Sequence, residues 1–479
     1  MGSTQRLVAG VDSSTQSTKV EIRDAETGAI VARASAPHPG TTPPRSEQHP
    51  ATWWQAFETA WAEAVQIAGV DTVAAISIGG QQHGMVVLDA DRQVVRPAKL
   101  WNDTESAPDA GWLVKQLGGA EAWAAAVGCV PVAAFTATKL SWLHRSEPDS
   151  WARLAHVLLP HDWMTLQLTG NLVTDRGDAS GTGYWSAQRE EYDWSILQII
   201  DKARDWSQIV PRVAGPREQV GEWNGIAVAC GTGDNMAGAL GLGLAPGEAV
   251  ISLGTSGTVF AVSDTATVDP TGAVAGFADA SGRFLPLVCT LNATKVTNAF
   301  ARILGVDFAE FDRLALAAPS GASGLTLLPY LDGERTPNLP LASGWLTGLR
   351  SDVRREDIAR AAVEGVACGL LDGLDALRLR APVQSVTLVG GGARSATYRQ
   401  VFAELCDVPV SVADADEAVA TGACVQAAAL AVGCDHADVI AAWGLGTRTP
   451  VAAGRVDRAA GDTVRQRFAE ARRQAYPLS

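Results

Sequence analysis

The sequence predicts an α/β protein made of two domains, and three observations support this prediction. The chain has 479 residues, which is more than a single hydrophobic core usually organises. Short apolar runs that end at glycine-rich turns alternate with longer segments of helical pattern. Each half also contains a strand, a turn rich in serine and threonine, and a second strand. We therefore expect one domain over residues 1–245 and a second over residues 246–479.

The first half opens with strand-like segments and continues with helices. A turn is predicted from Asp12 to Ser17, between the first two strands. The predicted strands are Leu7–Val11, Lys19–Arg23, Ala29–Ala34, Val73–Ile78 and Gly225–Ala229. The predicted helices are Pro50–Ala68, Ser106–Leu117, Ala120–Ala126, Thr138–His144 and one that begins near Met236.

The second half repeats this pattern. Its predicted strands are Ala249–Leu253, Thr258–Val262 and Val386–Val389, and its predicted helices are Arg354–Arg380, Ser395–Leu405 and Ala415–Val432. The segments Val11–Val20 and Leu253–Val259 both read as strand, hydroxyl-rich turn and strand, although short turns of this kind can match by chance. The repeat favours a ligand cleft with one phosphate-binding turn on each wall.

The composition is that of a soluble globular protein, with 47% hydrophobic and 19% charged residues. The net charge of −14 argues against nucleic acid and anionic membranes as main partners. No apolar run has membrane-spanning length, and strand-like residues begin so early that no signal peptide is expected. The seven scattered cysteines, without a Cys-x-x-Cys pair, predict a reducing, cytoplasmic compartment and no structural zinc. A homodimer is compatible with the sequence.

Asp234 is the most informative single residue. It follows the predicted strand Gly225–Ala229 and a glycine-rich turn, and a predicted helix comes after it. This arrangement presents a carboxylate at a strand end, where small neighbours let a substrate approach the backbone. A carboxylate at such a position can act as a general base on a hydroxyl.

Asp12 also follows an apolar strand, and it opens a turn of serine and threonine residues. One interpretation is a local turn cap, in which the carboxylate accepts backbone N–H bonds. The other is a carboxylate that faces the phosphates of a nucleotide through Mg²⁺, a hard cation that prefers oxygen ligands. The residues around Asp12 leave both interpretations open.

Two polar clusters suit the recognition of hydroxyl groups. Gln82 and His83 follow the predicted strand Val73–Ile78, and their amide and imidazole groups can both donate and accept hydrogen bonds. Trp101 precedes Asn102 and Asp103, which resembles a sugar-facing surface. The alternative is structural in each case, because a lone histidine or tryptophan more often packs in a core.

A glycine turn at Gly390–Ala393 separates a predicted strand from a predicted helix. It is either a tight connection or a place where a nucleotide lies against bare backbone. The dinucleotide pattern G-x-G-x-x-G is absent from this turn, and the Walker pattern G-x-x-x-x-G-K-[ST] is absent from the chain. A Rossmann dehydrogenase and a P-loop enzyme are therefore disfavoured.

Taken in order, the motifs resemble those of the FGGY family of carbohydrate kinases over nearly the whole chain. They are the Asp12 turn, Gly80–Gly84, Leu100–Asp103, Thr136–Leu143, Gly233–Asn235, Ser252–Gly257, Leu328–Leu331, Gly333–Pro337, Gly344–Leu349, Asp357–Ile358, Ala361–Glu364 and Gly390–Ser395. The resemblance implies the actin/Hsp70/sugar-kinase fold, which is ribonuclease H-like, with a catalytic cleft between two α/β domains. It also implies Mg²⁺- and ATP-dependent phosphorylation of a ketopentose, D-xylulose, to the 5-phosphate.

The resemblance also implies a role for each candidate residue. Asp234 would be the base for the sugar hydroxyl, and Asp12, with Asp234, would support Mg²⁺. The sugar would be held by Gln82, His83, Trp101, Asp234 and Asn235. ATP would be held by Gly254, Thr255, Gly391, Gly392 and Ala393, with Trp345 near the nucleotide.

The chain departs from the family pattern at two positions. Gln82 stands where these kinases usually have methionine, and Asp12-Ser13-Ser14-Thr15 stands where many have Asp-x-Gly-Thr. The first departure keeps a different ketopentose, a polyol or a deoxy sugar as an alternative substrate. A non-catalytic sensor on the same fold is a second alternative, which the presence of both Asp12 and Asp234 disfavours.

Overall fold

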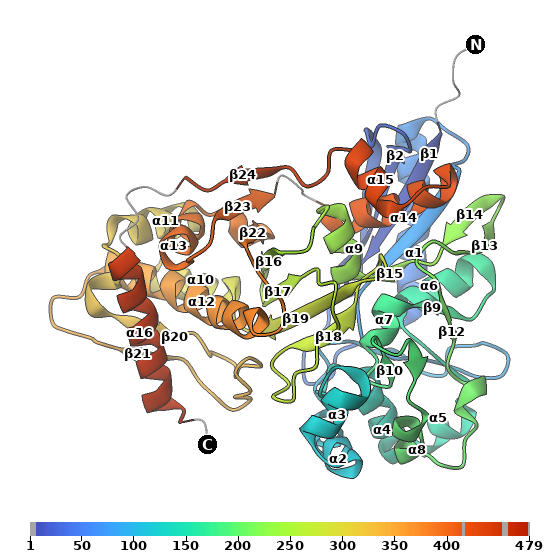
Figure 1. The fold of residues 1–479 in the computed structure, drawn as a ribbon, viewed down its shortest axis with the longest axis horizontal. Coiled ribbons are helices and arrows are strands. Elements are labelled where there is room, and N and C mark those ends of the chain that lie inside the picture. The colour runs from blue at the N-terminus through green and yellow to red at the C-terminus, as the bar shows by residue number, and fades with distance from the viewer. Residues whose placement is uncertain (1–5, 414–416, 453–457, 478–479) are drawn as a thin grey trace. The chain divides into compact units, whose positions relative to one another are not determined.

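The computed structural model describes residues 6–413, 417–452 and 458–477, and the chain forms two compact units (Figure 1). The first unit comprises Met1–Leu244, Asp264–Leu285 and Glu417–Gly446, and the second comprises Ala245–Ser263, Pro286–Asp416 and Thr447–Ser479. The chain first passes between units beside the predicted boundary at residues 245 and 246. The predicted ranges 1–245 and 246–479 are continuous, so they do not place the segments Asp264–Leu285 and Glu417–Gly446 in the first unit.

A mixed seven-stranded sheet organises the first unit. Its strand order is β13-β14-β5-β1-β2-β3, and β15 also pairs with β5. The strands are β1 (Leu7–Ser13), β2 (Ser17–Asp24), β3 (Ile30–Pro37), β5 (Ala75–Gly80), β13 (Gln219–Trp223), β14 (Ile226–Ala229) and β15 (Thr232–Gly233). Strands β1, β14 and β15 run parallel to β5, while β2, β3 and β13 are antiparallel to their neighbours.

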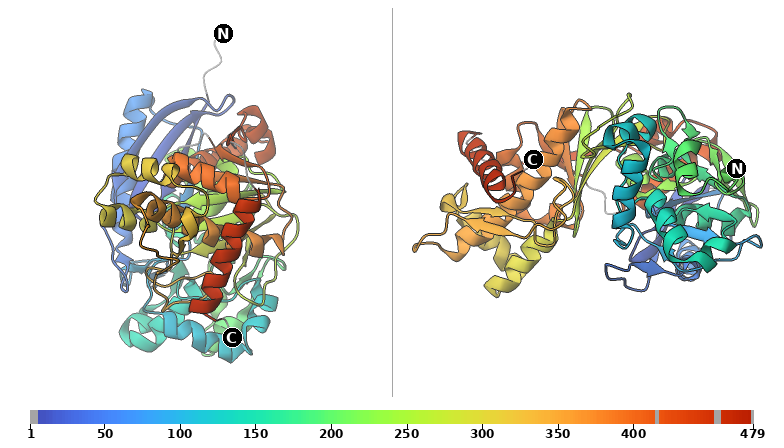
Figure 2. Two further views of the ribbon diagram at one scale, coloured as in Figure 1. Left: turned by 90° about the vertical axis from the view of Figure 1, so that its left-hand side faces the viewer. Right: turned by 90° about the horizontal axis from the view of Figure 1, so that it is seen from below.

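Both faces of this sheet are buried, which explains the continuous apolar run of β1. Successive side chains of a strand point to opposite faces. Leu7, Ala9 and Val11 belong to the core cluster that contains helix α1 (Pro50–Ala68), which lies along β2 and β3 (Figure 2). Val8 belongs to the cluster with helix α14 (Ala418–Val432), beside β1 in Figure 1.

The first unit also contains helices and short strands outside this sheet. The helices are α2 (Ala107–Leu117), α3 (Ala120–Val127), α4 (Thr136–Ser146), α5 (Pro148–Arg153), α6 (Pro160–Thr169), α7 (Arg176–Ser180), α8 (Trp194–Ile200), η1 (Trp206–Gln208), α9 (Asp234–Gly241) and α15 (His436–Ala442). The short strands are β4 (Glu47–Gln48), β6 (Val86–Leu88), β7 (Ala98–Lys99), β8 (His156–Leu158), β9 (Val173–Asp175), β10 (Trp185–Ser186), β11 (Glu191–Tyr192), β12 (Arg212–Ala214) and β18 (Ala275–Ala278).

The second unit is built on strands β19, β17, β16, β22, β23 and β24, which are neighbours in this order. These strands are β16 (Glu248–Leu253), β17 (Gly257–Ala261), β19 (Phe284–Thr290), β22 (Ser385–Val389), β23 (Val410–Ala413) and β24 (Arg448–Pro450). The other elements are α10 (Thr294–Leu304), α11 (Phe308–Ala317), η2 (Ala322–Gly324), β20 (Thr326–Leu328), β21 (Trp345–Thr347), α12 (Arg355–Arg378), η3 (Gly391–Arg394), α13 (Ala396–Leu405) and α16 (Arg458–Ala475).

The two units repeat one topology. In each, an antiparallel hairpin, β1–β2 or β16–β17, continues into a third antiparallel strand, β3 or β19. The first strand of each hairpin pairs in parallel with a later strand, β5 or β22, and the far edge of each sheet is antiparallel again. The repeated hairpin predicted from the sequence is therefore confirmed.

Some predicted boundaries were wrong because pairing with a neighbouring strand makes the observed strand longer than predicted. The predicted turn from Asp12 is shorter, because Asp12 pairs with Lys19 on one side and with Gly79 on the other. The strand predicted to end at Ile78 continues to Gly80, since β15 forms beside it within the glycine-rich turn that was predicted before Asp234. Helix α14 begins at Ala418, and the predicted start at Ala415 lies outside the described residues.

Within the described parts of the chain, no single helix has both the length and the apolar composition needed to cross a membrane. One sharply bent pair, α14 with α15, passes this test of length and composition when the two helices are taken together.

Candidate active site

Three strand ends meet in the first unit. Ser13 of β1 pairs with Gly80 of β5, and Gly80 also pairs with Gly233 of β15. Ligands of α/β proteins bind beyond the carboxyl ends of parallel strands. The residues predicted from the sequence at this edge, Asp12, Gln82, His83, Asp234 and Asn235, are brought there by these three strands.

Asp234 is the first residue of α9, after Gly233, so its carboxylate lies at the positive end of the helix dipole. The backbone N–H and the side-chain Nδ2 of Asn235 donate to Asp234 Oδ1 at 2.8 and 2.9 Å. Burial and the negative charge of Asp12 raise the pKa of Asp234 to about 7, although the bonds from Asn235 act in the opposite direction. A carboxylate with this pKa suits general-base work near neutral pH.

Asp12 is almost fully buried, and it faces a lysine across the hairpin. Lys19 Nζ lies 3.4 Å from Asp12 Oδ2 and 2.6 Å from Oε2 of Glu417, the residue before α14. Burial raises the pKa of Asp12 to about 6, against the effect of Lys19. Asp12 Oδ1 is buried without a hydrogen-bond partner among the described residues.

Gln82 and His83 lie just beyond the end of β5, after Gln81. Asn235 Nδ2 donates to Gln82 Oε1 at 2.8 Å, which joins Gln82 to the Asp234 pair. His83 has a left-handed backbone, with φ of 65°. Its ring packs between Phe135 and Phe277, with ring centroids 5.0 and 5.4 Å away, so its position is set by aromatic contacts.

In the segment Trp101–Asp103, the ring of Trp101 is half-buried and the carboxylate of Asp103 is buried. Trp101 Nε1 donates to Thr15 Oγ1 at 2.9 Å, and Thr15 Oγ1 donates to Gln81 Oε1 at 3.2 Å. Asp103 is fully buried and accepts two hydrogen bonds, of 3.0 and 3.1 Å, from the buried Lys99 ammonium. Trp101 therefore connects to the end of β5, while Asp103 holds its own loop in place.

His161 of α6 forms hydrogen bonds that connect this helix to the chain just before β15. Its Nδ1 lies 2.7 Å from Asp178 Oδ2 and 3.2 Å from Asp162 Oδ1, and its Nε2 lies 3.2 Å from the Cys230 carbonyl. Burial lowers the pKa of His161, but the two carboxylates outweigh it and raise this pKa to about 10. Both ring nitrogens face oxygens that accept hydrogen bonds, which agrees with a protonated imidazole that donates from each. This cluster is therefore an ion pair that donates to the chain just before β15.

The second unit brings two of its predicted segments together. Gly254 and Thr255 follow β16, and Gly391, Gly392 and Ala393 follow β22, its parallel neighbour. A Cβ at Gly392 would lie 2.8 Å from both Leu253 Cβ and Thr294 Cγ2, so a glycine is needed where this turn packs against the end of β16 and the start of α10. Trp345 lies on a separate element, because it pairs with Leu328 in the β20–β21 ribbon.

Comparisons with known proteins identify the family. The model for the N-terminal domain of the FGGY family of carbohydrate kinases matches residues 7–241, and that for the C-terminal domain matches residues 249–431. The chain belongs to the FGGY family of carbohydrate kinases. As an FGGY kinase it is a phosphotransferase whose substrates are a sugar-class small molecule and ATP. Its fold is the actin/Hsp70-like fold of these kinases.

Similar proteins cover almost the whole chain. The xylulose kinase of Streptomyces coelicolor is 48% identical over 91% of this chain and 90% of its own. The crystal structure of xylulose kinase from Bifidobacterium adolescentis is 38% identical, covers 98% of this chain and 100% of its own, and has a TM-score of 0.85. That of xylulose kinase from Rhodospirillum rubrum is 26% identical, covers 98% and 99%, and has a TM-score of 0.87.

Three polar residues at this edge of the FGGY kinase were missed from the sequence. Lys19 could have been found from the hairpin, since the register of β1 and β2 places it opposite Asp12. Glu417 and His161 carry no comparable local signal, because long-range packing brings Glu417 to Lys19 of β2 and His161 to Gly80 of β5.

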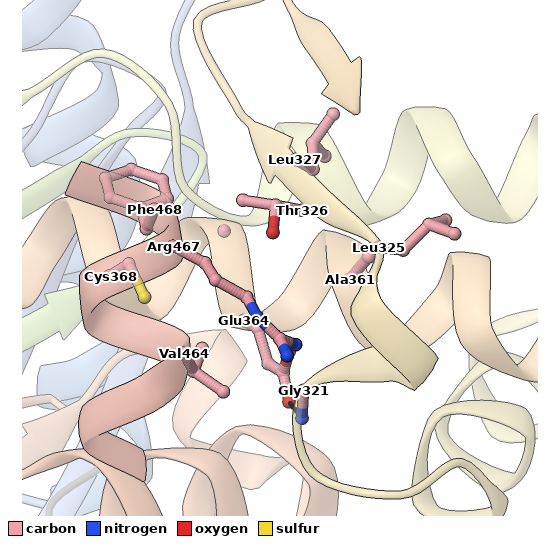
Figure 3. Close-up of a pocket in the computed structure, with 11 residues that line it drawn as sticks. Gly321, Leu325, Thr326, Leu327, Ala361, Glu364, Cys368, Val464, Arg467 and Phe468 are labelled. Carbon is pink, nitrogen blue, oxygen red and sulfur yellow. Dashed lines mark hydrogen bonds between the residues drawn. The ribbon is translucent and has the colours of Figure 1, made fainter. Parts of the chain in front are cut away.

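A small cavity in the second unit of this FGGY kinase is no candidate for its substrates. It is lined by residues of α12, α16 and β20, with Glu364 and Gly321 at one end (Figure 3). The cavity has room for about one water molecule. Glu364 is already engaged, because it accepts hydrogen bonds from Arg360 at 2.7 Å and from the Gly321 N–H at 2.8 Å.

Proposed function

We propose that this FGGY kinase transfers the γ-phosphoryl group of ATP to the C5 hydroxyl of D-xylulose. The observation that carries the proposal is the carboxylate of Asp234, held through one oxygen by Asn235 and with a pKa of about 7. The similar proteins named above as xylulose kinases support the choice of sugar, at up to 48% identity. They do not favour the alternative of another ketopentose, a polyol or a deoxy sugar.

Asp234 acts as the base in this mechanism. The hydrogen bonds from Asn235 go to Oδ1, which leaves Oδ2 as the oxygen that accepts the proton of the sugar hydroxyl. The hydroxyl oxygen then attacks the γ-phosphorus in line with the leaving ADP oxygen. Phosphoryl transfer depends mainly on positioning and on charge neutralisation, so Asp234 orients the hydroxyl as well as accepting its proton.

Asp12 and Asp234 are the residues that would hold the Mg²⁺ ion that accompanies the nucleotide. The fit rests on Asp12 Oδ1, a buried carboxylate oxygen without a partner among the described residues. Carboxylate oxygens are ligands that Mg²⁺ prefers, and the bound ion would neutralise charge on the phosphates. Lys19 supplies a further positive charge beside Asp12.

The sugar and the nucleotide are assigned to the side chains and turns described above. Gln82, His83, Trp101 and Asn235 bind the sugar, because each offers a polar group or a ring next to the strand ends in the first unit. Gly254, Thr255, Gly391, Gly392 and Ala393 bind ATP, since two adjacent turns of bare backbone can approach phosphates closely. Trp345 remains a candidate for contact with the nucleotide.

The test is the release of ADP from ATP with and without D-xylulose, for the wild type and for Asp234→Asn. We expect the sugar-dependent rate of the variant to fall by about 10²–10⁴-fold, because an amide cannot accept the proton. ATP binding, measured by calorimetry, should be retained. Near-normal turnover by Asp234→Asn would overturn the base assignment, and turnover of another sugar in place of D-xylulose would overturn the substrate.

A further inference from the structure

Three polar side chains form a chain of hydrogen bonds that ends at Gln82. The two hydrogen atoms of Asn235 Nδ2 are both used, one toward Asp234 Oδ1 at 2.9 Å and one toward Gln82 Oε1 at 2.8 Å. Gln82 and Asn235 are 153 residues apart in the sequence, so this link is a product of the fold.

The chemistry of these groups decides which way each amide points. An ionised carboxylate can only accept hydrogen bonds, so Asn235 must present its NH₂ group to Asp234. The second hydrogen atom of that NH₂ group then requires an acceptor, and Gln82 must present its carbonyl oxygen. The NH₂ group of Gln82 is therefore the end directed away from Asn235.

The NH₂ group of Gln82 is buried and has no partner among the described residues. A buried donor without an acceptor is unfavourable, and such groups commonly mark functional sites. The side chain packs directly over the bare backbone of Gly233, where an added Cβ would lie 2.7 Å from Gln82 Cγ and 2.9 Å from Nε2. The structure thus holds an oriented donor beside the base.

We propose that Gln82 is a specificity-determining residue, whose NH₂ group selects a sugar that presents an acceptor oxygen, the ketone of a ketose, over the corresponding polyol. This inference rests on the proposed function, because it concerns the sugar that Asp234 deprotonates. A ketone oxygen only accepts hydrogen bonds and matches a donor completely. A hydroxyl in its place also carries a hydrogen atom, for which the NH₂ group offers no acceptor.

Two substitutions change the hydrogen-bonding character of residue 82 without a large change in side-chain size. Gln82→Met removes the donor, and Gln82→Glu, studied at about pH 8 where a glutamate is ionised, replaces it with an acceptor. Dissociation constants of D-xylulose and xylitol are measured by calorimetry, so the comparison does not depend on turnover. We expect the preference for the ketose to fall about tenfold in Gln82→Met and further in Gln82→Glu.

The ratio of the two constants is insensitive to a general loss of binding, and the ATP dissociation constant and the melting temperature serve as controls of folding. An unchanged preference for the ketose in Gln82→Met, or a stronger preference in Gln82→Glu than in Gln82→Met, would overturn the inference. A wild type that binds neither sugar would also overturn it.

Sugar-dependent ADP release by the wild type decides the proposed function separately. A wild type that binds and prefers the ketose without phosphorylating it would overturn the proposed function and leave the role of Gln82 intact.

Discussion

At the scale of single residues, the ionisation of Asp234 should control the pH dependence of the reaction. Burial and the charge of Asp12 raise the pKa of Asp234 from 3.8 to about 7. The base is ionised above this pKa and protonated below it, so kcat/KM for the sugar should fall as the pH falls through 7. Well below 7, the decline should be about tenfold per pH unit, which initial rates at saturating ATP would measure.

Two substitutions should move this pH profile in opposite directions. Asn235→Ala removes the side-chain hydrogen bond that lowers the pKa of Asp234 and keeps the bond from the backbone N–H, so the decline should begin at a higher pH. Asp12→Asn removes the negative charge that raises this pKa, so the residual activity should decline at a lower pH. A melting temperature that stays constant over the same pH range excludes unfolding. Shifts of the same sign in both variants would contradict the assignment of the titrating group.

At the scale of elements, the crossing of α9 and α14 depends on glycine. A Cβ at Gly422 of α14 would overlap the carbonyl of Ala237 in α9, where the two backbones touch. Gly422→Ala should therefore destabilise the first unit by about 3 kcal/mol, which denaturant unfolding would measure. Gly238→Ala on α9 is the matched control, because its Cβ would meet Val419 at an ordinary 3.9 Å. Equal stability of the two variants would show that the backbones are not in close contact.

At the scale of the whole molecule, the first unit is not a continuous stretch of chain. Residues Glu417–Gly446 return to it, and α14 covers the sheet face that includes Val8 and Ala75. A fragment of residues 1–245 should expose this face, bind a hydrophobic dye and unfold without cooperativity. Attaching residues 417–446 through a flexible linker should reduce dye binding and sharpen the thermal transition.

The control for that experiment is the same fragment with residues 458–477 attached, which carry α16 of the second unit. This helix should leave dye binding unchanged, since it has no place on the first sheet. Cooperative unfolding of residues 1–245 alone would show that α14 is dispensable for the first unit.

The sequence by itself determined the local elements and the chemistry of the strand ends. Helix α1 was predicted from Pro50 to Ala68 as observed, because Pro50 and the left-handed Gly69 mark its ends. Only the tertiary structure decided that Asp12 lies inside a strand opposite Lys19 and that Glu417 forms an ion pair with this lysine. The hydrogen bond between Asn235 and Gln82 is likewise visible only in the folded chain. The physical reason is that propensities and turn residues act between near neighbours. Strand register, helix crossings and hydrogen bonds across 153 residues depend on the packing of the whole unit.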